Sequence, residues 1–332
     1  MTAAHRPDRS EQRLWVRLDE DTLAGPESGT PTQALARLEV PPALQAVVAR
    51  VLAYHETFAP GVEVVEHVLP DGRLRVVVPL SDEEGAATPS AMVIGASTAA
   101  ATVRLRGRMH GLSLELQPGA AAALLGAPAS EFAGRAVPLE AVWGREAASL
   151  RERLAEAPGT AAQAKLLHAV LWQRWQHGQR RHGPGRADAQ AVVSAALQFV
   201  QGGAGPGALR DRSDAGRLRW PLDAMPPLGE VAAALGMGER RLQQLFREHV
   251  GLSPRTWRRL VRLQRVVRAL RARPAARGPR TGPDAPPPWA ELAVAAGFYD
   301  QAHLANEFRA LAGLTPGEFW SRAISGSSKT GG

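Results

Sequence analysis

The sequence contains no cysteine and no long apolar run. Without thiols the chain can form no disulfide framework, no thiolate metal site and no cysteine nucleophile, and it cannot accept alkyl groups on a thiolate. No stretch of about 18 apolar residues occurs, and the first residues (MTAAHRPDRSEQR) lack the apolar core of a signal peptide. We therefore expect a soluble cytoplasmic protein that does not enter a membrane.

Recognisable catalytic phrases are also missing. The chain has no GxSxG, Walker A or GxGxxG segment, so neither a hydrolase nor a nucleotide-binding enzyme has support from a motif. We expect no catalytic residues, no metal, no cofactor and no enzyme activity.

Charge is distributed unevenly along the 332 residues, which are enough for two domains with separate cores. Residues 1–227 carry 24 basic and 24 acidic side chains, whereas residues 228–332 carry 16 basic and 8 acidic ones. The C-terminal third thus holds the whole formal charge of +8. A coding bias toward arginine would act on the whole chain, so it does not explain why acidic residues balance the basic ones only in residues 1–227. The segregation therefore indicates a domain that binds a polyanion.

The N-terminal part has a mixed pattern. Residues 1–31 are polar and predict a disordered tail, and residues 32–145 predict a small β-barrel or sandwich with added helices. Short alternating segments indicate strands at Val62–Val68, Arg73–Val78, Met92–Gly95, Thr102–Arg108 and Leu112–Leu116. Pro70-Asp71-Gly72 has the composition of a tight turn. A helix is expected to open at Pro118 and to end at Gly126.

Three helical patterns follow this β-rich part. They cover Arg145–Ala157, Thr160–Gln179 and Ala187–Gln201, and a loop rich in Gly, Arg and Asp comes after them. We interpret residues 146–219 as a helical connector and loop.

An internal repeat is the most informative feature of the basic part. The copies run from Leu228 to Trp257 (LGEVAAALGMGERRLQQLFREHVGLSPRTW) and from Trp289 to Phe319 (WAELAVAAGFYDQAHLANEFRALAGLTPGEF). The matched positions are Gly236 with Gly297, Leu242 with Leu304, Phe246 with Phe308, Arg247 with Arg309, and GLSP with GLTP. The second copy has one extra residue between its glycine and the helix that follows.

Each copy predicts a helix-turn-helix. A short amphipathic helix (Leu228–Leu235; Ala290–Ala296) ends at a glycine suited to a left-handed C-cap, and a three- or four-residue turn follows. The second helix then places apolar anchors against its partner helices and leaves a polar face for a major groove. A trihelical bundle would show the same periodicity, but two matched copies in a basic domain favour the helix-turn-helix.

One continuous helix is predicted between the copies, over Arg255–Arg273. Its arginines at positions 255, 258, 259, 262 and 265 fall within an arc of about 120°, beside an apolar stripe of Leu260, Leu263, Val267 and Leu270. Two interpretations stay open for this face: a solvated cationic surface, or contacts with phosphates and with acids between the two units.

The two copies, the arginine-rich helix and the phrases GLSPRTWRRLVRLQR and AGFYDQAHLANEFRALAGLTP resemble the DNA-binding domain of the AraC/XylS family of transcription regulators. We assign this domain to residues 220–325, followed by a disordered tail at 326–332. The resemblance implies that the second helix of each unit enters a major groove. It also implies that the linking helix sets the two units about one DNA turn apart.

The family's functional positions carry over residue by residue. The implied base contacts are Arg240, Arg241, Gln243, Gln244, Gln301, His303 and Asn306, and the implied phosphate contacts are Arg247 and Arg309. Arg258 and Arg262 are further candidates for phosphate contacts. Arg and Gln can each form two hydrogen bonds with a base, guanine and adenine respectively. His303 could equally be a packing residue, and Arg is frequent in the family where this chain has Gln244 and Asn306.

The linker Pro274–Pro288 is longer than the family usually has. Its six prolines and two glycines disfavour a helix or a strand, and we expect a disordered loop without a role in binding. In the alternative interpretation, Arg277 and Arg280 reach a phosphate between the two grooves.

Residues 38–144 resemble a cupin-like domain that precedes such units in one subgroup of regulators, through the phrases HVLPDGRLRVVV, VIGAST, LELQPGAAAALLG and VPLEAVWG. The resemblance implies ligand sensing, dimerisation or both. A metal-dependent cupin enzyme is the competing interpretation, but it needs two or three His and a carboxylate on neighbouring strands. His55, His67 and His110 are widely separated and form no HxH pair.

Three arginines alternate with other residues near the end of this domain. Arg104, Arg106 and Arg108 would lie on one face of a strand. The face is either solvated or part of an anion-binding pocket.

These features together predict an α+β protein: a β-rich, cupin-like barrel domain with helices, then an all-α domain of two helix-turn-helix units joined by a long helix. The expected function is sequence-specific DNA binding in transcription regulation, controlled by a small-molecule effector or by self-association through the N-terminal domain. Double-stranded DNA is the expected partner. RNA polymerase is a second partner if the protein is an activator, and a homodimer is a further expectation.

Overall fold

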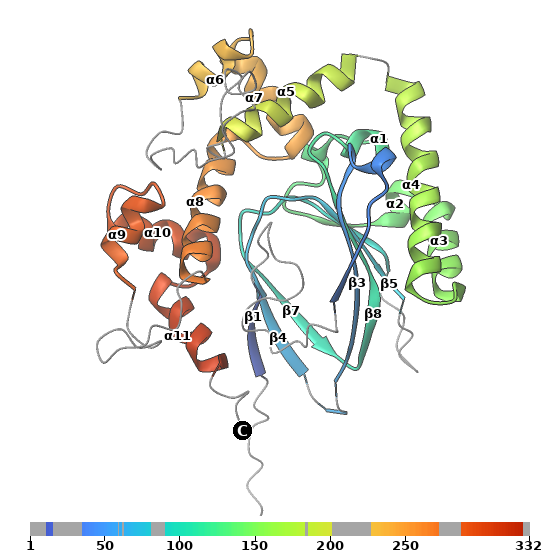
Figure 1. The fold of residues 1–332 in the computed structure, drawn as a ribbon, viewed down its shortest axis with the longest axis horizontal. Helices are drawn as coiled ribbons and strands as arrows, with labels where there is room; N and C mark the ends of the chain where they lie inside the picture. Colours follow the sequence, from blue (N-terminus) through green and yellow to red (C-terminus); the bar gives the residue numbers. More distant parts are fainter. Residues whose placement is uncertain are drawn as a thin grey trace, which may run out of the picture.

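The protein has an N-terminal sheet domain and a C-terminal helical domain that pack side by side, as the computed structural model shows (Figure 1). It describes residues 11–15, 35–58, 60–61, 63–80, 90–182, 185–200, 227–271 and 287–327. The predicted α+β class, with a β-rich domain followed by an all-α domain, is confirmed.

The larger sheet has six strands in the order β2-β3-β8-β5-β6-β9, and all neighbours are antiparallel. Its strands are β2 (Leu35–Leu38), β3 (Val48–Thr57), β5 (Arg75–Pro79), β6 (Met92–Ile94), β8 (Arg108–Leu116) and β9 (Ala136–Pro138). Along β8, Leu112 and Leu114 are buried in the main apolar core. Alternation directs Ser113 and Glu115 to the opposite face, and both are buried as well.

A smaller sheet has the order β1-β4-β7, formed by β1 (Glu11–Trp15), β4 (Glu63–Val68) and β7 (Ala101–Arg106). β1 is parallel to β4, and β4 is antiparallel to β7. The chain passes from this sheet to the larger one at Gly107, whose φ of 63° separates β7 from β8. The two sheets meet at a small cluster of Phe58, Leu105 and Met109.

Several sequence predictions need correction in this domain. The disordered tail over residues 1–31 is wrong at Glu11–Trp15, because pairing with β4 supplies hydrogen bonds that local sequence does not reveal. The single strand over Thr102–Arg108 is wrong at Gly107. Strands β2, β3 and β9 were not predicted. Residues 51–53 of β3 are buried without interruption, so β3 lacks a clean alternation.

Four helices cover the larger sheet on one side: α1 (Ala121–Leu125), α2 (Leu139–Trp143), α3 (Arg145–Glu156) and α4 (Thr160–His182). Gly126 ends α1 with a φ of 78°, as its position predicted. Leu150 of α3 and Leu167 and Leu171 of α4 pack into the apolar core of the sheet domain. The predicted helices at 145–157 and 160–179 are thereby confirmed.

The helical domain consists of α5 (Gly185–Val200), α6 (Leu228–Ala234), α7 (Glu239–Val250), α8 (Pro254–Arg271), α9 (Trp289–Ala295), α10 (Gln301–Ala312) and α11 (Pro316–Ser327). Its core contains Phe246, Phe308 and Phe319, and α5 joins it through Val193 and Leu197. The predicted connector is therefore divided: α3 and α4 pack on the sheet, and α5 packs on the helical domain. The loop after α5 and residues 274–286 of the predicted insert lie outside the described residues.

Candidate nucleic-acid interface

The first helix-turn-helix unit consists of α6 and α7. Gly236 follows α6 with a φ of 68°, a left-handed conformation that glycine adopts at little cost. α7 then begins at Glu239. Leu242 and Phe246 are fully buried on its inner face. The predicted anchors of this unit are confirmed.

The second unit, α9 and α10, repeats this geometry with one more residue in its turn. Gly297 has a φ of 86°, and Asp300 caps α10 because its Oδ1 accepts a hydrogen bond of 2.7 Å from the backbone N–H of His303. Leu304 and Phe308 are buried like their counterparts in α7. The extra residue predicted from the repeat thus lies in the turn.

The GLSP and GLTP phrases join the end of each second helix to the start of the next. Gly251 and Gly313 cap α7 and α10 in the left-handed conformation. Ser253 Oγ then accepts a hydrogen bond from the N–H of Thr256, and Thr315 forms a reciprocal capping pair with Glu318. Each phrase therefore contains a stop signal and a start signal, which explains its recurrence.

Five of the seven predicted base-contact residues lie on the outer faces of α7 and α10. The exposed ones are Arg240, Arg241, Gln244, Gln301 and Asn306, and the predicted phosphate contacts Arg247 and Arg309 are exposed too. Gln243 is half-buried, and its Nε2 donates a hydrogen bond of 2.9 Å to Glu239. None of the exposed side chains is covered by the sheet domain.

His303 is held within the turn of the second unit. Its Nδ1 accepts a hydrogen bond of 3.2 Å from the backbone N–H of Tyr299, and its ring packs edge-on against Phe298 at 5.4 Å. Of the two roles considered for His303, this geometry supports packing. Tyr299 itself is 88% exposed and was not among the predicted site residues.

Two arginines of α8 contact the second unit. Arg259 forms an ion pair of 2.6 Å with Glu307 of α10. Arg262 lies 4.0 Å from the same carboxylate, and its guanidinium stacks over Phe298 at 5.1 Å. These contacts agree with the acid-pairing interpretation of the cationic face. They also direct Arg262 toward the interior of the domain.

A basic cleft of about 370 Å³ opens between the first unit and the start of α8. It is lined by Leu228, Glu239, Gln243, Arg247, Ser253, Pro254, Arg255 and Arg258. Burial lowers the pKa of Arg258, the charge of Arg262 lowers it further, and Glu239 opposes both effects. Arg247, Arg255 and Arg258 all line this cleft beside the N-terminus of α8, where backbone N–H groups also favour an anion.

Arg255 was predicted only as part of the cationic face of the linking helix and not as a separate phosphate contact, although it lines this cleft. The signal was available in its position directly after Pro254. A proline at the first helical position places the next side chain in the first turn of the helix.

Two of the three histidines considered in the β-rich domain lie close together in the structure. His55 and His110 are cross-strand partners in β3 and β8, with ring centroids 5.6 Å apart, so separation in sequence was misleading for this pair. His67 belongs to β4 of the other sheet. Within the described ranges, no three His, Cys, Asp or Glu side chains are grouped to hold a metal ion.

The three alternating arginines do not lie on one strand. Arg104 and Arg106 are exposed on β7, whereas Arg108 belongs to β8.

Comparison with known proteins gives two family matches. A profile described as a helix-turn-helix domain matches residues 231–322, and a profile described as a domain of unknown function (DUF6597) matches residues 37–138. No curated protein sequence matches the chain. No helix of the described segments has the length and apolar character needed to span a bilayer.

The solved structures that match include ToxT from Vibrio cholerae. A 1.65 Å structure of ToxT is 9% identical with a TM-score of 0.35, and it aligns over 82% of this chain and 97% of ToxT. Another, bound to (E)-4-(8-methylnaphthalen-1-yl)but-3-enoic acid, is 8% identical with a TM-score of 0.31 and aligns over 82% of this chain and 98% of ToxT.

Proposed function

We propose that this protein is a DNA-binding transcription regulator whose residues 231–322 form a helix-turn-helix domain of the AraC type. It recognises a specific double-stranded DNA site through α7 and α10. One observation carries the proposal. Two matched units expose polar outer faces in the domain that holds the whole net charge of +8. The charge supplies affinity for any DNA, and the two faces supply the choice of sequence.

The base contacts fall to different side chains in the two units. Arg240, Arg241 and Gln244 project from the exposed face of α7, and Gln301 and Asn306 project from that of α10. Arg reads guanine, while Gln and Asn read adenine, through paired hydrogen bonds in the major groove. The two units therefore read different short blocks of sequence.

Phosphate binding is assigned to the cleft at the start of α8. Arg247 and Arg258 line it together with Arg255, and the first turn of α8 adds its N–H groups. Arg309 is the exposed counterpart of Arg247 in the second unit. These contacts position the protein on the duplex without reading its sequence.

Selection of bound duplexes from a random pool, with the full-length protein at near-physiological salt, tests the proposal. We expect enrichment of two short blocks about one helical turn, roughly 10 base pairs, apart. A Gln301→Ala variant should lose information in one block and keep the other. Recovery of a random pool at that salt would contradict sequence-specific binding.

Regulation is assigned to the sheet domain, through a small-molecule effector, through self-association into a homodimer, or through both. An activator of this kind would also contact RNA polymerase, and the protein would act in the cytoplasm. An enzyme in the sheet domain is the alternative. It predicts turnover or a bound metal, and elemental analysis of the purified protein distinguishes the two.

A further inference from the structure

The turn of the second helix-turn-helix unit is one residue longer than that of the first, and the structure identifies the inserted residue. In the first unit the backbone N–H of Met237 donates a hydrogen bond of 3.0 Å to the carbonyl five residues earlier, and Phe298 does the same at 2.9 Å in the second. Met237 and Phe298 are therefore equivalent. Gly238, the N-cap of α7, follows Met237 directly, whereas Tyr299 stands between Phe298 and the N-cap Asp300. Tyr299 is thus the residue without a counterpart.

This inserted side chain is directed into solvent. Tyr299 is 88% exposed, and among the described residues the next most exposed large hydrophobic side chain, Val294, reaches only 51%. Phe298 beside it is buried in the core of the helical domain. The insertion therefore adds nothing to the core, and its aromatic ring is presented to whatever approaches the turn.

The backbone that carries Tyr299 is held in place. Its N–H donates a hydrogen bond of 3.2 Å to Nδ1 of His303, and the His303 ring packs edge-on against Phe298 at 5.4 Å. The N–H of His303 in turn donates to Oδ1 of Asp300 at 2.7 Å. A contact made by the Tyr299 side chain therefore has to order only two side-chain torsions, which keeps its entropic cost low.

The turn lies at the entrance to the second recognition helix. Gln301, a proposed base contact, is the first residue of α10 and follows Tyr299 by two positions. In a helix-turn-helix the first helix crosses the DNA backbone and the N-terminal residues of the second reach base edges. The turn between the two helices is therefore next to the phosphates that border the groove.

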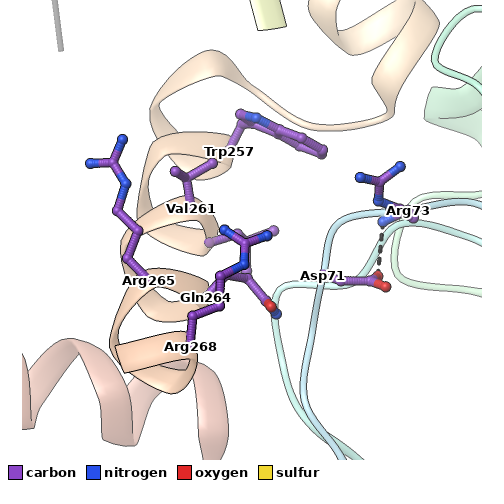
Figure 2. Close-up of a pocket in the computed structure, with 8 residues that line it drawn as sticks. Asp71, Arg73, Trp257, Val261, Gln264, Arg265 and Arg268 are labelled. Atoms are coloured by element: carbon purple, nitrogen blue, oxygen red, sulfur yellow. Dashed lines mark hydrogen bonds between the residues drawn. The ribbon is translucent and has the colours of Figure 1, made fainter. Parts of the chain in front are cut away.

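The sheet domain attaches to other parts of the helical domain. It contacts α8, where Gln264 faces the turn that carries Asp71 (Figure 2). It also contacts the far end of α10, where the N–H of Ala100 donates to the carbonyl of Leu311 at 2.8 Å. Ten residues of helix, about 15 Å, separate Leu311 from the start of α10. The end of α10 that carries Tyr299 therefore stays accessible to DNA.

We propose that Tyr299 is a DNA contact of the second unit, with its hydroxyl donating a hydrogen bond to a phosphate oxygen at the edge of the groove that α10 enters. The inference rests on the DNA recognition proposed above. A phenol is an uncharged donor, and a phosphate contact positions the protein without reading a base. Because the first unit has no residue at this place, the contact marks one of the two blocks only.

Removal of the hydroxyl tests the contact, with full-length protein and the selected duplex. Tyr299→Phe should weaken binding about tenfold, as for the loss of a hydrogen bond to a charged group. It should leave the slope of log affinity against log salt unchanged, because a neutral donor releases no counterion, whereas Arg309→Gln should reduce that slope by about one. Tyr54→Phe, at the chain's other tyrosine, is the matched control and should bind as tightly as the unaltered protein. Equal affinity of Tyr299→Phe, or a changed consensus, would overturn a phosphate contact by this residue.

Neutral phosphates locate the contact on the DNA. Each phosphate of the selected duplex is replaced in turn by a methylphosphonate. One replacement beside the second block should weaken binding by the unaltered protein and have little effect on Tyr299→Phe, while the other sensitive positions stay the same in both proteins. Identical profiles for the two proteins would overturn the proposal. Absence of any selected duplex for the unaltered protein would instead contradict the proposed DNA recognition itself.

His303 is assigned as the positioning residue for this contact. His303→Phe keeps a ring against Phe298 but removes the acceptor for the N–H of Tyr299. It should weaken binding several-fold without changing the consensus, and it should have little further effect in Tyr299→Phe, because His303 acts through Tyr299. Additive losses in the double variant, or a consensus altered by His303→Phe alone, would overturn this positioning role.

Discussion

The side-chain amide of Gln264 donates a hydrogen bond of 3.0 Å to the backbone carbonyl of Pro70, a residue 194 positions earlier in the chain. The bond is buried and fixes the middle of α8 to the turn that leads into β5. Two backbone bonds extend the attachment: Gly119 donates to His249 at the end of α7, and Ala100 donates to Leu311 of α10. The sheet domain therefore holds both helix-turn-helix units while their outer faces stay exposed.

Gly72 lies directly against α8, and a methyl group there should loosen this attachment. Its φ is 72°, and a Cβ would lie 2.8 Å from both Leu260 Cδ1 and Trp257 Cζ3. We expect Gly72→Ala to lower the free energy of unfolding by about 2–3 kcal/mol, from backbone strain and crowding together. Thermal unfolding should then separate into two transitions, one for each domain.

Gly134→Ala is the matched control. Gly134 also has a positive φ, of 67°, but nothing lies within 4 Å of a Cβ built there. This variant should show the backbone strain alone, about 1–2 kcal/mol, and a single transition. Two transitions in both variants would mean that strain, rather than contact with α8, uncouples the domains.

The second prediction separates reading of sequence from general affinity. Arg240→Ala should cost about 1–3 kcal/mol on the selected site and blur one or two positions of its consensus. Arg247→Ala should weaken binding to all sequences alike and reduce the slope of log affinity against log salt by about one. Binding titrations on selected and scrambled duplexes at several salt concentrations measure both effects. An unchanged consensus for Arg240→Ala would show that the register proposed for α7 is wrong.

The helix-turn-helix units could be predicted because their signals are local. Glycine C-caps such as Gly251, the N-cap Ser253 and anchors one turn apart lie within a few residues of each other, and the second copy repeats them. The strand partners could not be predicted in this way. β1 pairs with β4 about 50 residues later, and His55 meets His110 only through the β3–β8 register.

The packing partner of α5 could not be predicted from the sequence either. Its apolar residues indicate a helix but do not specify whether its partner is the sheet or the basic domain. The structure places Val193 and Leu197 in the core that contains Phe246 and Phe308. Tertiary packing of this kind depends on shape, which periodicity does not encode.

The third prediction follows from α5. A fragment of residues 185–327 should unfold at a higher temperature than one of residues 220–327, because only the longer one keeps Val193, Ala196 and Leu197. Complete burial of a Val or Leu side chain contributes about 1.5–3 kcal/mol. Thermal unfolding followed by circular dichroism measures the difference. In the longer fragment, Val193→Ala should lower the unfolding temperature and the exposed Ala191→Ser should not; equal stability of the two fragments would contradict the role of α5.

The last prediction concerns Glu115, which lies in a buried ion cluster of the sheet domain. Its side chain accepts from Arg50 at 2.8 Å and pairs with Arg73 at 2.9 Å, and Arg75 lies 3.9 Å away. Glu115→Gln would leave three buried or half-buried guanidiniums around a neutral group. We expect a loss of about 3–5 kcal/mol in the free energy of unfolding at pH 7, as for other broken buried ion pairs.

The pH dependence of this loss identifies its cause. Burial alone would raise the pKa of Glu115, but the charges of Arg73, Arg75 and Arg50 outweigh it and lower the pKa below the ordinary value of 4.5. A lowered pKa in the folded state contributes stability above the pKa of the unfolded chain, and that contribution disappears as pH falls through the folded pKa. The difference between the unaltered protein and Glu115→Gln should therefore shrink steadily below pH 4.5. Glu140→Gln, at an exposed position of α2, should show no such loss at any pH. A difference for Glu115→Gln that stayed constant into acid would assign the effect to packing, and the charge of Glu115 would have no part in it.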